Sequence, residues 1–154
     1  VRLLLANDGP LLASLQDKAA LLDLGDRVRF LGRIPQERLA ALLRSVALYV
    51  SLSRSDGASL SLMEAMACGA FPVVSDIPAN RAWIADGVNG YLVPVDSPAV
   101  TARKARDAGR LPPCRSAGMD HDEPSGHGEG RTDHTPSVLR RGLPETGWRT
   151  VWLV

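Results

Sequence analysis

The side chains best suited to chemistry are two carboxylates eight positions apart, Asp56 and Glu64, in the stretch SLSRSDGASLSLMEAMACG at 51–69. An apolar, partly β-branched run before the two acids predicts a buried strand, and apolar residues recur at helical spacing after Asp56. Asp56 therefore falls in a glycine loop and Glu64 in the helix that follows. A helix N-terminus behind such a loop presents unpaired backbone N–H groups and the positive end of the helix dipole, which suits a phosphate.

Each acid also has an ordinary structural explanation. Ser61 to Glu64 read SLME, which fits a capping box in which Glu64 bonds back to the N-cap N–H. From the residues alone, that interpretation is favoured for Glu64. Asp56 followed by Gly57 is typical of a turn, because Asp bonds its own backbone and Gly accepts a positive φ. Gly69 stands where a helix C-cap glycine belongs, so the helix is predicted to end there.

The chain up to about residue 100 alternates strands with helices. Pro10 and Pro35 suit the first turns of helices, and Ser97 with Pro98 suits the start of another, although its apolar pattern does not continue. Regular alternation of strands with helices of about ten residues implies parallel pairing with right-handed crossovers, hence an α/β fold. The predicted strands lie at 1–9, 28–32, 47–53, 71–76 and 91–93.

The bulk composition excludes several classes of protein. With 154 residues, 45% hydrophobic content and a formal charge of +1, the chain has the size and composition of one globular domain. That charge provides no strong field for nucleic acid or a membrane surface, so neither is an expected partner. Cys68 and Cys114 lack the spacing of a disulfide framework or a zinc site, so a reducing cytoplasm is the default location. No apolar run approaches the roughly 18 residues of a membrane span, and no signal-peptide pattern is present.

From about residue 107 the apolar periodicity disappears, and Gly, Pro, His and charged residues dominate. Such a segment cannot bury enough apolar surface to offset the entropy of ordering, so 107–154 is predicted to be disordered. The abrupt change of composition also fits a frameshift in a GC-rich gene, which reading the coding DNA in the other frames would test. Metal-binding side-chain types occur here without ligand spacing, so no metal site is predicted from Asp120, His121, Asp122, Glu123, His127, Asp133 and His134.

The sequence has an acid, seven residues and a Glu, which are closed by EAMACG and followed by a PVVSD strand. This pattern resembles the nucleotide-sugar site of the family 4 retaining glycosyltransferases. The likeness runs from about Val1 to Val100 and includes VRFLGRIP, DIPANRAWI and DGVNGYLVP. It implies the Rossmann-like second half of a GT-B fold, a parallel sheet with flanking helices that binds the donor. The implied activity is transfer of a sugar from a nucleoside-diphosphate sugar to an acceptor hydroxyl with retention. Most members carry Glu as the first acid, where this chain carries Asp56.

The resemblance also implies a role for each matched residue. Asp56 matches the acid of the catalytic site that contacts donor-sugar hydroxyls, and Glu64 matches the acid that binds the ribose hydroxyls. Arg33 and Ile34 match the position of backbone contacts to the nucleobase, although an exposed Arg and a packed Ile would explain them equally well. No metal ion or other cofactor is expected in this site. The N–H groups expected to hold the diphosphate are those of Gly57, Ala58, Ser59 and Leu60.

The same resemblance divides the chain and predicts what accompanies it. Residues 1–106 would be a partial donor-binding domain and 107–154 an atypical tail, with the N-terminal acceptor domain missing. The first strand of the donor domain, with its phosphate-binding glycine, Arg and Lys, would be missing too. That strand is central in the order 3-2-1-4-5-6. The strands at 1–9 and 47–53 are therefore expected to lack the neighbour between them, and the isolated chain to be inactive.

Two other classes of function stay open. One is an inactive, truncated nucleotide-binding module, and the other is a protein similar to the nucleotide-sugar epimerases, which share this architecture. EAMACG followed by PVVSD and NGYLVP favours the transferase over the epimerase.

Overall fold

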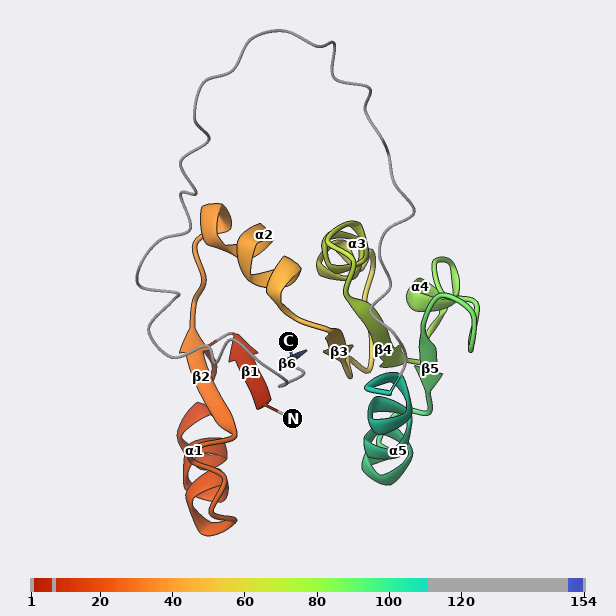
Figure 1. The fold of residues 1–154 in the computed structure, drawn as a ribbon. Helices are drawn as coiled ribbons and strands as arrows, with labels where there is room; N and C mark the ends of the chain where they lie inside the picture. The colour runs from red at the N-terminus through yellow and green to blue at the C-terminus, as the bar shows by residue number, and fades with distance from the viewer. Residues whose placement is uncertain (1, 7, 111–149, 154) are drawn as a thin grey trace, which may run out of the picture.

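The computed structural model describes residues 2–6, 8–110 and 150–153, which form an α/β fold built on one parallel sheet (Figure 1). Its six strands follow the order β2-β1-β6-β3-β4-β5, and every neighbouring pair is parallel. All the strands predicted before residue 100 are present, so the predicted α/β class is confirmed. The strands are β1 (Arg2–Ala6), β2 (Val28–Gly32), β3 (Leu48–Ser51), β4 (Phe71–Ser75), β5 (Tyr91–Val93) and β6 (Thr150–Leu153).

Helices lie on both faces of the sheet. In Figure 1, α2 and α3 lie on one side and α1 and α5 on the other. Tyr49 shares a core cluster with Leu43 and Leu62 of α2 and α3, whereas Leu48 shares one with Ala108 of α5. Successive residues of β3 thus face opposite layers, as the period of a strand requires. The helices are α1 (Leu12–Leu21), α2 (Gln36–Ser45), α3 (Leu60–Ala67), α4 (Pro78–Arg81) and α5 (Pro98–Ala108).

The helix that starts at Pro98 continues further than the sequence pattern predicted. α5 spans Pro98–Ala108, so the expected domain boundary after residue 106 falls inside it. Val100 and Ala105 pack against the core cluster on this face, and Ala108 is only 2% exposed. Small apolar side chains suffice for this contact, and they give a weak pattern among the charged residues of the same helix. The prediction of disorder from residue 107 onward is therefore wrong at the end of α5.

The sheet has no gap at its centre, contrary to the expectation that the strands at 1–9 and 47–53 would lack a neighbour. β6 lies between β1 and β3, with Val151 opposite both Leu3 and Leu48. The β-branched and aromatic residues of TVWL favour a strand. The facing N–H and C=O groups of β1 and β3 need partners when they are buried. β6 supplies them, so the prediction of disorder is also wrong for 150–153.

The remaining predictions for the tail concern residues 111–149, which lie outside the described residues. They include disorder, the frameshift, Cys114 and the metal-type side chains, and they stay predictions. Among the helices of the described residues, none is both long and apolar enough to cross a membrane.

Candidate functional site

The predicted site residues follow the ends of parallel strands, which all point to one edge of the sheet, called the carboxyl edge below. β2 is followed by Arg33 and Ile34, β3 by the loop at 52–59 that opens α3, and β4 by the segment that opens α4. Ligands of open α/β sheets bind outside this edge. The topology therefore places the residues predicted from separate motifs along one edge of the sheet.

The loop before α3 offers unpaired backbone donors. Within the described part of the chain, the N–H groups of Gly57, Ala58 and Ser59 donate no hydrogen bond. The N–H of Leu60 does donate, to Ala58 O at 2.8 Å. Three of the four groups expected to hold a diphosphate are thus available at the start of α3, and the fourth would have to exchange its partner.

The two ends of α3 differ in how they are capped. Ser59 is its N-cap residue, which places Ser61 inside the helix and leaves the capping box without its N-cap serine. No side chain of the described residues caps this helix, so the capping-box interpretation of Glu64 is wrong. At the other end Gly69 has a φ of 83°, its N–H donates to Met66 O, and the N–H of Ala70 donates to Ala65 O. This is a Schellman motif, and it confirms Gly69 as the terminating glycine.

Glu64 bonds to the preceding helix instead of to its own. Gln36 Nε2 donates a hydrogen bond to Glu64 Oε1 at 3.1 Å, and the contact is exposed. Gln36 is the first residue of α2 and comes shortly after Arg33 and Ile34. Glu64 is therefore hydrogen-bonded to a residue that lies close in sequence to the predicted base-binding segment. Its other carboxylate oxygen is left for a ligand.

Asp56 is held by a chain of short hydrogen bonds that reaches into β4. Ser59 Oγ lies 2.7 Å from Asp56 Oδ2 and 2.8 Å from Asn80 Oδ1. Asn80 Nδ2 donates to the backbone oxygen of Ser75 at 2.8 Å. Asp56 itself is exposed, whereas Ser59 and Asn80 are only 6% and 2% exposed. The carboxylate at the surface is thus braced by two buried polar side chains.

A hydrogen bond of Tyr49 joins β3 to the first turn of α3. It is 1% exposed, and its hydroxyl lies 2.8 Å from Ser61 Oγ. Burial raises the pKa of Tyr49, its hydrogen bond with Ser61 opposes that rise, and the charges of Asp56 and Glu64 add to it. Both carboxylates are therefore close enough to act electrostatically on the same phenol.

The segment after β2 shows no side-chain signature of base binding. Arg33 is exposed, with its Nε 3.4 Å from Asp8 Oδ1. Ile34 packs against the core cluster that includes α2 and α3. These are the ordinary structural roles weighed for both residues, and backbone contacts to a base stay a prediction.

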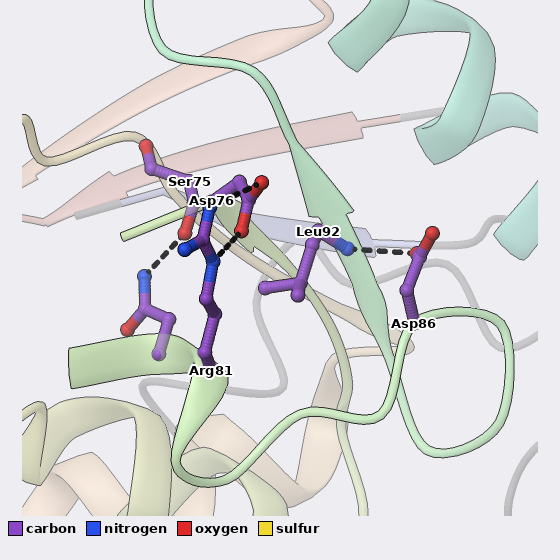
Figure 2. A network of polar contacts seen from close by, with 6 residues as sticks. Ser75, Asp76, Arg81, Asp86 and Leu92 are labelled. Atoms are coloured by element: carbon purple, nitrogen blue, oxygen red, sulfur yellow. Dashed lines mark hydrogen bonds and ion pairs between the residues drawn. The ribbon is translucent and has the colours of Figure 1, made fainter. Parts of the chain in front are cut away.

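An ion pair braces the turn that carries Asn80. Arg81 Nε and Nη2 donate to the two carboxylate oxygens of Asp76 at 2.6 and 3.0 Å, as Figure 2 shows. The hydrogen bonds from Arg81 hold the pKa of Asp76 below its ordinary value. In the same view Asp86 accepts a hydrogen bond from the N–H of Leu92 at 3.0 Å. These contacts hold the segments before and after α4, between β4 and β5.

Sequence reasoning missed three residues of this arrangement, namely Gln36, Asn80 and Tyr49. Asn80 belongs to the motif DIPANRAWI, which supports the resemblance. A polar side chain just past a strand end could have marked it as a site residue, because α/β sheets bind their ligands there. Tyr49 and Gln36 carried no local signal, because their partners are 12 and 28 residues away in sequence.

The parallel sheet with helices on both faces, and with the loop before α3 at its carboxyl edge, defines an α/β domain of the GT-B type. The family model described as "Glycosyl transferases group 1" matches residues 1–116. The chain belongs to this glycosyltransferase family.

The relatives that resemble this chain are much longer than the region they share with it. A phosphatidyl-myo-inositol mannosyltransferase of Mycobacterium tuberculosis is 36% identical over 85 residues, covering 54% of this chain and 22% of the relative. A D-inositol 3-phosphate glycosyltransferase of Streptomyces avermitilis is 36% identical over 93 residues, covering 60% and 20%. The chain thus spans about a fifth of the length of these relatives.

Among solved structures, the pneumococcal O-GlcNAc transferase GtfA in complex with UDP and GlcNAc is similar to this chain, with a TM-score of 0.58 and 27% sequence identity. The match covers 70% of this chain and 21% of the transferase. The similarity supports the assignment of the described residues to a GT-B type of fold.

Proposed function

We propose that this chain binds a nucleoside-diphosphate sugar at the carboxyl edge and serves as the donor-binding part of a retaining glycosyltransferase. The observation that carries the proposal is the arrangement around α3. Unpaired N–H groups stand at its start, Asp56 lies beside them, and Glu64 projects from the same helix toward Gln36. Family membership and the likeness to a transferase solved with UDP and GlcNAc support it.

Each part of the donor has a matching group in this proposal. The N–H groups of residues 57–60 bind the diphosphate, because donors and the helix dipole at a helix start favour anions. Glu64 accepts hydrogen bonds from the ribose hydroxyls, and Asp56 from hydroxyls of the sugar. The backbone of Arg33 and Ile34 contacts the base. No metal ion is assigned a role.

The chemistry follows from where charge develops. When the bond between the sugar carbon and the β-phosphate oxygen breaks, the electron pair leaves with the phosphate. Fixed N–H donors aimed at that phosphate stabilise the growing negative charge and lower the barrier. The acceptor oxygen then forms its bond on the face that the phosphate leaves and gives its proton to the departing phosphate oxygen, so the configuration is retained. Because the chain spans about a fifth of its relatives, the acceptor is assigned to a part of the whole protein beyond it.

Ligand-induced thermal stabilisation tests the proposal, because a ligand that binds only the folded state raises its apparent stability. UDP should raise the melting temperature more than uridine does, or GDP more than guanosine, and inorganic pyrophosphate should compete with the preferred nucleotide. Equal shifts for the nucleoside and its diphosphate, or no competition by pyrophosphate, would contradict a diphosphate site at the start of α3.

A further inference from the structure

In the chain of contacts from Asp56 to β4, the Ser59 hydroxyl has two acceptor oxygens within reach but only one proton to donate. Ser59 Oγ lies within hydrogen-bond distance of two oxygens, Asp56 Oδ2 at 2.7 Å and Asn80 Oδ1 at 2.8 Å. A serine hydroxyl carries a single proton and can donate to only one of them at a time.

Asn80 cannot relieve this shortage by turning its amide over. Its Nδ2 donates to the backbone oxygen of Ser75 at 2.8 Å. A flipped amide would set Oδ1 against that carbonyl and leave two acceptors facing each other. Asn80 is 2% exposed, so the carbonyl would have no solvent to replace the lost bond. The orientation of Asn80 is therefore fixed, with its oxygen toward Ser59.

The two acceptors of the Ser59 proton differ in what can reach them. Asn80 Oδ1 is buried behind Ser59, whereas Asp56 is exposed beside the unpaired N–H groups of the loop. A ligand at the carboxyl edge can donate a hydrogen bond to Asp56 but not to Asn80. If a ligand donates to Asp56 Oδ2, the Ser59 proton becomes available for Asn80, and every group in the chain of contacts is then satisfied.

We propose that Ser59 and Asn80 are positioning residues that couple β4 to sugar recognition by Asp56. With the sugar position empty, the Ser59 hydroxyl donates to Asp56. When a sugar hydroxyl donates to Asp56, the Ser59 hydroxyl rotates to donate to Asn80, which is clamped to Ser75. The inference rests on the proposed function, because it takes the ligand hydroxyl to be that of a nucleotide sugar. No covalent bond changes in this step.

The test compares nucleotide sugars with the matching nucleotides by isothermal titration calorimetry on the full chain. The ligands are GDP with GDP-mannose and UDP with UDP-GlcNAc. Ser59→Ala removes the hydroxyl and keeps the backbone N–H. The variant should lower the affinity for the nucleotide sugar relative to the matching nucleotide by about tenfold, because sugar binding no longer supplies a donor to the buried Asn80 Oδ1. Asn80→Ala should lower the same ratio in the same direction.

Two controls separate positioning from a general loss of structure. Ser45→Ala removes a serine hydroxyl that bonds only the Leu42 backbone oxygen, and it should leave the affinity ratio unchanged. In the Ser59→Ala background, Asn80→Ala should lower the ratio no further, because the residue through which Asn80 acts is gone. Should Asn80→Ala fail to fold, Ser59→Ala decides alone through the same ratio.

The inference is overturned if Ser59→Ala weakens the nucleotide and the nucleotide sugar equally, or if the effects of Ser59→Ala and Asn80→Ala are additive. Absence of binding by all four ligands to the unaltered chain would overturn the proposed function itself, and this inference with it. A wild-type chain that binds the nucleotides and shows no ratio change in Ser59→Ala refutes only the positioning role.

Discussion

Gln36 Nε2 donates a hydrogen bond to Glu64 Oε1 at 3.1 Å and so joins the first turn of α2 to α3 beside the carboxyl edge. The bond replaces the capping role that the local sequence suggested for Glu64. An amide donor holds one carboxylate oxygen and leaves the other for a ligand. The pair therefore explains how a charged residue is tolerated on a helix whose buried face is apolar.

Glu64→Gln tests the ribose role directly. The amide oxygen that this substitution introduces could still accept from Gln36, so the fold should be unchanged, but the charge is lost. Hydrogen bonds to charged groups contribute roughly 1.5–3 kcal/mol, so affinity for the preferred ribonucleoside diphosphate should fall by about ten- to a hundredfold. Affinity for the 2′,3′-dideoxy analogue should hardly change, as measured by calorimetry.

Glu37→Gln is the matched control, because it makes the same chemical change at an exposed position beside Gln36. It should leave both affinities unchanged. Equal weakening of the ribonucleotide and the dideoxynucleotide by Glu64→Gln would refute the ribose assignment.

The burial of Tyr49 should make the folded protein less stable at high pH. Burial raises its pKa above the ordinary value of 10.0, so the folded state keeps the phenol proton more firmly than the unfolded chain does. This contribution is fully present below the pKa of the unfolded chain and is lost as the pH rises through the folded pKa. As the pH rises above 10.0, the free energy of unfolding of the wild type should therefore fall more steeply than that of Tyr49→Phe.

Urea unfolding of both proteins at several pH values checks this difference. At neutral pH, Tyr49→Phe should cost about 1 kcal/mol, because the bond to Ser61 is lost. Parallel pH profiles for the two proteins would show that Tyr49 does not titrate differently in the folded state.

Ser75 carries a buried hydroxyl at the end of β4. It is 1% exposed, and its Oγ finds no hydrogen-bond partner among the described residues. Burying a hydroxyl without a partner costs free energy, so Ser75→Ala should leave the free energy of unfolding unchanged or raise it by about 1 kcal/mol. The backbone oxygen that holds Asn80 stays in place. A loss of more than about 1 kcal/mol in denaturant unfolding would reveal a role for the hydroxyl.

β6 should stabilise the centre of the sheet. Val151→Pro removes a backbone N–H in the middle of a strand that is paired on both sides, with Leu3 and with Leu48. Hydrogen exchange at the amides of β1 and β3 should become faster by more than about tenfold, since each 1.4 kcal/mol of lost stability gives a factor of ten. Mass spectrometry of peptides covering 2–6 and 48–51 measures the change.

Thr150→Pro serves as the comparison, because the first residue of a strand tolerates proline better than the middle. It should have the smaller effect on exchange in both strands. Identical exchange in the wild type and in Val151→Pro would mean that β6 contributes nothing to the pairing of β1 and β3.

The sequence by itself determined the elements that repeat with a local period. Alternating strands and helices and the glycine that ends α3 follow from residue types a few positions apart. Strand and helix periods are properties of neighbouring residues, so a single chain reveals them.

Only the tertiary structure decided which distant residues meet. It placed β6 between β1 and β3, paired Gln36 with Glu64, and set Asn80 behind Ser59. Contacts with the sheet also determined that α5 extends as far as Ala108. Such contacts depend on strand order and on how helices pack against the sheet, and the same short patterns are compatible with many arrangements. The tertiary structure paired Glu64 with Gln36 rather than with a cap, because α3 begins after Ser59 and the capping-box position three residues on is Leu62.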